Sequence, residues 1–143
     1  MENNEMDLSK VHKLALFRQY YGITHAMWQM EHMASHGWGG LSIEKEQEAR
    51  KECIEALNPI KLEILKRLDL TEEDGTFHPT FKAWYAANDS FIFALSDDEY
   101  NQFEKAEAGY VGSDFADSTE FEKILEKLNY EQYITEKLAG INV

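Results

Sequence analysis

Residues 16–34 read LFRQYYGITHAMWQMEHMA, a stretch without proline and without the alternation of apolar and polar residues that is typical of strands. Apolar side chains recur in it at every third or fourth residue, namely at Leu16, Tyr20, Ile23, Met27, Met30 and Ala34. This spacing places them on one face of an α-helix, which needs packing partners along its length. We predict a helix that starts near Asp7 or Ser9 and ends at His36, because Gly37 suits a helix C-cap.

The helical period continues beyond this stretch. Ser42 is a candidate N-cap for a second helix, and an apolar stripe then extends across Pro59. Because proline lacks a backbone N–H and clashes with the preceding turn, we expect the second helix to break or kink sharply at Asn58–Pro59. The stripe consists of Ala49, Cys53, Ala56, Ile60, Ile64 and Leu68.

Helix start signals recur in the second half of the chain. His78-Pro79-Thr80 predicts one helix, and the capping boxes at residues 96–99 and 119–122 predict two more, with loop structure at residues 109–114. The last helix is expected to end at Gly140. The chain is therefore predicted to be all-α, an irregular single-domain bundle of five to six helices around a long N-terminal helix, with residues 1–143 as one domain.

The formal net charge is −13, from 27 acidic and 14 basic residues. Such a charge argues against direct binding to nucleic acid or to an anionic membrane surface, and it favours a basic protein partner. The longest apolar run, at residues 91–95, is too short to span a membrane, and the acidic N-terminus does not resemble a signal peptide. With Cys53 as the only cysteine, expected to be a buried and inert thiol, we predict a cytoplasmic protein without cofactors.

The negative charge is concentrated in the second half. Residues 1–70 have a net charge of −2 and residues 71–143 one of −11, and residues 97–122 hold nine acids and only one base, Lys105. Acids interleaved with aromatic rings can attract a basic partner and anchor it, although caps and core packing would account for the same residues. The predicted partner-binding residues are Asp97, Asp98, Glu99, Tyr100, Glu104, Glu107, Tyr110, Asp114, Phe115, Asp117 and Glu120.

We therefore predict a protein-binding module, an inhibitor or an immunity-type protein that mimics nucleic acid and docks on a nuclease or another nucleic-acid-binding protein. No nucleophile lies at motif spacing from a base, so no catalytic residue is assigned.

Two alternatives rest on His25, His32 and His36 of the first helix, which lie opposite its apolar stripe. One alternative is a metal-dependent helical-bundle enzyme that uses His32 and His36, one helical turn apart, with His78 as a candidate third ligand. The other is a self-associating structural protein, a homodimer packed through Tyr21, Trp28 and the histidines.

Overall fold

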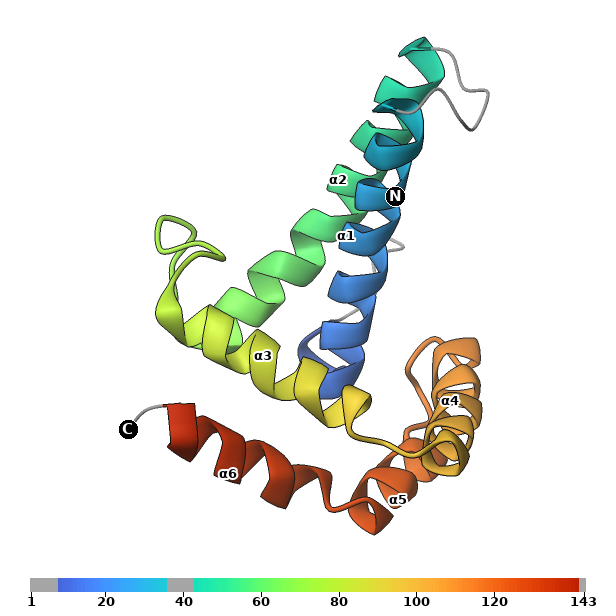
Figure 1. The fold of residues 1–143 in the computed structure, drawn as a ribbon, viewed down its shortest axis with the longest axis vertical. Helices are drawn as coiled ribbons and strands as arrows, with labels where there is room; N and C mark the ends of the chain where they lie inside the picture. Colours follow the sequence, from blue (N-terminus) through green and yellow to red (C-terminus); the bar gives the residue numbers. More distant parts are fainter. Residues whose placement is uncertain (1–7, 36–42, 142–143) are drawn as a thin grey trace. The chain divides into compact units, whose positions relative to one another are not determined.

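A computed structural model describes residues 8–35 and 43–141 of the chain. These residues form helices and connecting turns without any strand, which confirms the all-α prediction (Figure 1). No helix among them is long and apolar enough to cross a membrane. The elements are the 3₁₀ helix η1 (Leu8–Lys10) and the α-helices α1 (Lys13–Ser35), α2 (Ile43–Arg67), α3 (Pro79–Phe93), α4 (Asp97–Gly112), α5 (Thr119–Lys127) and α6 (Tyr130–Ile141).

The described helices fall into two compact units. Residues 8–72 form the N-terminal unit, which contains η1, α1 and α2, and residues 73–141 form the C-terminal unit, which contains α3 to α6. The prediction that the chain is one domain stays a prediction.

The N-terminal unit is a hairpin of two long helices, α1 and α2, which lie side by side in Figure 1. The first turns of α1 are apolar and buried, with Leu14 and Leu16 fully inaccessible to solvent. Ile60, Ile64 and Leu65 of α2 are buried as well. The prediction that the stripe of the first helix needs a partner along its length agrees with this pairing, although Tyr20, Ile23, Met27 and Met30 are only half-buried.

Arg67 ties the end of α2 to η1. Its Nη2 donates to the carbonyl oxygens of Leu8 at 2.8 Å and Ser9 at 3.1 Å, and its Nε donates to Glu63 at 2.8 Å. The planar guanidinium can donate to three acceptors at once. A lysine ammonium at the same place would reach them with poorer hydrogen-bond geometry. The connection holds the start of the described chain against the far end of the hairpin.

The predicted break at Pro59 is wrong, because α2 continues through it from Ile43 to Arg67. Pro59 and the preceding turn residue Glu55 are both exposed, so the carbonyl that loses its helical N–H partner faces solvent. Ile60 and Ile64 follow on the buried side. Their burial favours the continuous helix over the local preference of proline.

In the C-terminal unit, α3 packs against α6. His78 caps α3 as predicted: its Nδ1 accepts a hydrogen bond from the Thr80 backbone N–H at 3.1 Å, and Pro79 occupies the first helical position. Phe91 of α3 meets Tyr130 of α6 edge to face, with 4.9 Å between the ring centroids. Phe81, Trp84 and Phe91 of α3 are buried in this core, whereas Phe93 at the end of the helix is exposed.

Two linked, buried hydrogen bonds join the same two helices. Tyr130 Oη donates to Asn88 Oδ1 at 2.5 Å, and Asn88 Nδ2 donates to the Trp84 carbonyl at 2.9 Å. Asn88 is fully buried and Tyr130 is 1% exposed. Burial, with a smaller contribution from the Glu131 charge, raises the pKa of the Tyr130 phenol. These hydrogen bonds satisfy the buried amide of Asn88, which would destabilise the folded protein if it had no partner.

The sequence pattern predicts one last helix from Thr119 to Gly140, but the structure has two, α5 and α6. Asn129 separates them with a left-handed φ of 58°, which asparagine tolerates better than most residues. The interruption directs Tyr130 and Ile134 into contact with α3.

We expect Tyr130→Phe to lower the free energy of unfolding by about 1–3 kcal/mol, because Asn88 Oδ1 loses its partner while it stays buried. The tyrosine pKa is raised in the folded state, so this stabilisation is present below pH 10 and declines as the pH rises further. Urea unfolding at pH 7 and pH 10.5 measures both effects. Equal stability of the two proteins at pH 7 would contradict the role of this hydrogen bond.

Candidate functional site

The start of α4 is as predicted. Ser96 Oγ accepts from the Glu99 N–H at 3.2 Å, and Glu99 Oε1 accepts from the Ser96 N–H at 2.9 Å. This reciprocal pair is a complete capping box. Glu99 is therefore half-buried and engaged in the helix start, whereas Asp97 and Asp98 are exposed.

The end of α4 differs from the prediction, because residues 109–112 are helical and not a loop. The helix closes with Asp114 at φ 56°, and the Phe115 N–H bonds to the Tyr110 carbonyl at 2.9 Å. This six-to-one bond is that of a Schellman motif, in which the two bonded residues also make an apolar contact. Here the Phe115 ring meets the Tyr110 ring edge to face at 5.0 Å.

The predicted capping box at the start of α5 is wrong. Thr119 is the first helical residue, and Ser118 precedes it without a side-chain cap hydrogen bond to the backbone. Asp117 Oδ1 accepts from the Thr119 N–H at 3.1 Å instead. Side-chain and backbone hydrogen bonds from Thr119 lower the pKa of Asp117. Ser118 Oγ bonds to Glu122, so the acid at 122 contacts a different residue from the one the motif indicates.

An aromatic cluster joins α4 to α5. The Tyr110 ring stacks on Phe121 with centroids 4.9 Å apart, and Phe103 lies 5.7 Å from Phe121. Phe103 and Phe121 are fully buried and Tyr110 is 2% exposed. The ring of Tyr110, which is one of the predicted partner-binding residues, is therefore part of the core. Tyr100 and Phe115 are half-buried and keep some accessible surface.

Exposed carboxylates lie on α4, on its connection to α5 and on α5 itself. By helical spacing, one side of α4 carries a row of acidic and apolar residues that we call the acidic face. Asp98 lies on another side of α4, with Lys105 seven residues further on. Asp114 and Asp117 are exposed in the connection to α5, and Glu120 is exposed on α5 itself. The acidic face consists of Asp97, Tyr100, Glu104, Glu107 and Val111.

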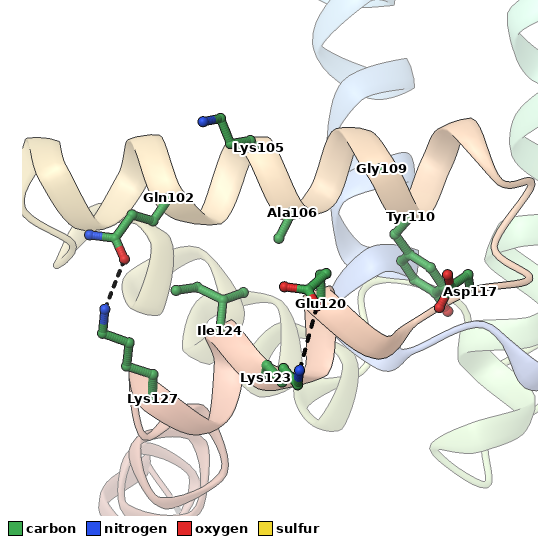
Figure 2. A pocket seen from close by; sticks show the side chains of 10 residues that line it. All are labelled: Gln102, Lys105, Ala106, Gly109, Tyr110, Asp117, Glu120, Lys123, Ile124 and Lys127. Carbon is green, nitrogen blue, oxygen red and sulfur yellow. Dashed lines mark hydrogen bonds and ion pairs between the residues drawn. The ribbon is translucent and has the colours of Figure 1, made fainter.

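Opposite the acidic face, α4 and α5 enclose a groove of about 430 Å³. Figure 2 shows Ala106 and Ile124 facing one another across it. Gly109 and Tyr110 extend the apolar lining from α4. At one end Lys127 Nζ donates to Gln102 Oε1 at 3.0 Å, a bond that bridges the two helices. The other lining residues are Lys105, Asp117, Glu120 and Lys123.

Sequence reasoning missed the lysines of this groove. Lys105, Lys123 and Lys127 are three of the five basic residues in residues 71–143. Their scarcity in an acidic half is a signal in the sequence, but their placement around one groove depends on the packing of α5 on α4. Lys123 lies 3.6 Å from Glu120, and no side-chain partner of Lys105 occurs in the part of the chain that the structure describes.

The residues of the metal hypothesis are not brought together in the described ranges. No group of three or more metal-ligating side chains occurs in residues 8–35 and 43–141. His78 uses its Nδ1 as the cap of α3, His32 is exposed on α1, and His36 lies outside the described residues. Cys53 is half-buried, so it is less enclosed than predicted.

The histidine side of α1 instead forms a row of rings, which we call the α1 ring row: Tyr21, His25, Trp28 and His32. Neighbouring rings lie 5.5, 5.9 and 5.2 Å apart and are nearly parallel. Trp28 is 58% exposed and Tyr21 is 36% exposed. Large rings exposed together in this way are typical of contact surfaces.

Comparison with known proteins adds no functional assignment: no family model, characterised protein or solved structure matches this chain.

A glycine substitution near the end of α4 tests whether this end is helical, and a substitution at Gly75, in the turn before α3, serves as the contrast. A Cβ at Gly109 meets no atom within 4 Å, so Gly109→Ala should stabilise the protein by about 0.5–1 kcal/mol through helix propensity. Gly75 has a φ of 67°, so Gly75→Ala should destabilise it by about 1 kcal/mol. Thermal and urea unfolding compare the two variants. Destabilisation by Gly109→Ala would contradict a helix that extends to Gly112.

Proposed function

We propose that this protein is an acidic binding module that docks the acidic face of α4 on a basic protein, in the manner of an inhibitor or immunity protein for a nucleic-acid-binding enzyme. The observation that carries the proposal is the exposure of Asp97 and Glu104 on one side of the helix. Neither side chain has an ion pair or hydrogen bond within the described ranges. Their charge is thus available to a partner.

The same face offers apolar contact area between its charges. Val111 is 39% exposed, and Tyr100 is half-buried with its ring 6.2 Å from that of Phe103. Tyr100 and Val111 flank Glu104 and Glu107 at spacings of three and four residues, so all four lie on the side that a partner would cover. Charge accelerates the encounter, and an anchored ring that is already held in place loses little entropy on binding.

The test replaces Asp97 with Asn and Glu104 with Gln in the full chain. After a partner is isolated on the immobilised protein, we expect its association rate with this variant to fall about three- to tenfold at low salt. Surface plasmon resonance at 50 and 300 mM salt also gives the salt dependence of that rate. This dependence should weaken in the variant, because two of the charges that attract the partner are gone.

A matched control replaces Asp98 with Asn and Glu126 with Gln, two exposed acids outside the acidic face. Like the test variant, this control loses two negative charges, one of them from the first turn of α4. Equal losses in the two variants would show an effect of net charge alone and contradict docking through this face. A partner without excess positive charge would contradict the proposal as well.

A second candidate function is self-association through the α1 ring row, favoured by the 58% exposure of Trp28. A second copy placed on this row would cover the rings of both chains at once, as expected of a two-fold interface.

We expect Trp28→Gln to shift a dimer to monomer in sedimentation velocity across a hundredfold range of protein concentration. The control is Phe93→Gln, because Phe93 is 91% exposed at the end of α3, in the other unit. A wild-type protein that stays monomeric throughout this range, or equal effects of both substitutions, would refute self-association through the row.

A further inference from the structure

We infer that the groove between α4 and α5 is a binding site for an organic monoanion with an elongated apolar body. The inference is independent of the docking proposal, because the groove lies on the opposite side of α4 from the acidic face.

The floor of the groove is apolar and open. Ala106 and Gly109 of α4 face Ile124 of α5, and the Tyr110 ring closes one end (Figure 2). Ile124 is 8% exposed. At Gly109, an added Cβ would meet nothing within 4 Å, so the missing side chain leaves space in the groove and not a tight packing contact. From Gln102 to Tyr110 the helix rises about 12 Å, enough for a medium-length alkyl chain or two linked aromatic rings.

The two ends of the groove differ in charge. Lys127 and Gln102 form the end away from Tyr110, where the ammonium is bonded to a neutral amide oxygen at 3.0 Å and not to a carboxylate. Lys105 follows Gln102 by one turn of α4, but Figure 2 shows its side chain extending away from α5, so Lys127 supplies the positive charge at this end. Asp117 lines the groove at the Tyr110 end.

This polarity orients the ligand. A carboxylate or sulfonate is attracted to Lys127, and it is repelled from Glu120 and Asp117, which also line the groove. The apolar body then lies along Ala106 and Ile124 toward Tyr110. The net charge of the protein opposes anions at long range, but salt screens that repulsion beyond about 8 Å, whereas Lys127 acts at contact distance. A groove of about 430 Å³ is within the usual size of small-molecule sites.

The test uses the fluorescent aryl sulfonate 1-anilinonaphthalene-8-sulfonate with the full-length protein. Gly109→Leu places a side chain in the groove, and we expect it to weaken probe binding at least tenfold. Lys127→Gln keeps a polar side chain opposite Gln102 but removes the charge, and it should weaken binding about three- to fivefold. N-phenyl-1-naphthylamine, the uncharged analogue of the probe, should bind more weakly to the wild type and respond to Gly109→Leu but not to Lys127→Gln.

Two controls separate the groove from other surfaces. Gly22→Leu adds the same side chain to α1, where a Cβ also meets nothing within 4 Å, and Lys82→Gln removes a lysine of α3 that lies 5.9 Å from the Phe77 ring. Both should bind the probe like the wild type, and circular dichroism with urea unfolding verifies that all variants fold. Unchanged binding in Gly109→Leu would overturn the site. Equal affinity for the charged and the uncharged probe would overturn its assignment to anions.

Discussion

The stacking of Tyr110 on Phe121 is the contact on which both faces of the α4–α5 hairpin depend. It holds the end of α4 against the start of α5, and the Phe115 ring covers Tyr110 at 5.0 Å from the turn between them. Burial of a large side chain contributes about 1.5–3 kcal/mol, which is comparable to the combined helix cost of about 2 kcal/mol for Gly109 and Gly112. The ring can therefore keep α4 helical through Gly109 and Gly112, and the helical Gly109 in turn opens the groove.

Helical geometry then sorts the charges of α4. Residues three, four and seven apart share a side, so Glu104 falls near Asp97 while Lys105 falls near Asp98. One short helix thereby presents only carboxylates in one direction and a carboxylate with an ammonium in another. Because exposed charges are screened over about 8 Å, a ligand at either face responds mainly to the nearest side chains. The local arrangement, more than the net charge of −13, decides which ions each face attracts.

The sequence was sufficient where structure is decided locally. The box at Ser96 and Glu99 needs only residues three apart, and the cap at His78 only the next two residues, so both helix starts were predicted. The sequence was insufficient where distant contacts outweigh local preference. Pro59 stays helical because Ile60 and Ile64 are buried, and Tyr110 is core because Phe121 packs on it. The composition predicts the acids of the site. The groove could not be predicted, because it depends on how α5 packs on α4, and the pattern of a single helix does not contain that information.

The C-terminal unit thus separates rigid and adaptable groups. Its ring and amide contacts, including the bond of Tyr130 to the fully buried Asn88, lie inside, where a single arrangement satisfies every polar atom. Its charged side chains lie outside on long flexible stems, as at Lys105 and Glu104. The fixed core determines the backbone position of each charged residue, and its flexible side chain adjusts to the ligand or partner. Recognition by this unit therefore relies on the positions of the helices for its geometry and on flexible charged side chains for its attraction. A substitution in the core should alter both the acidic face and the groove. A substitution at the surface should alter only the face on which it lies.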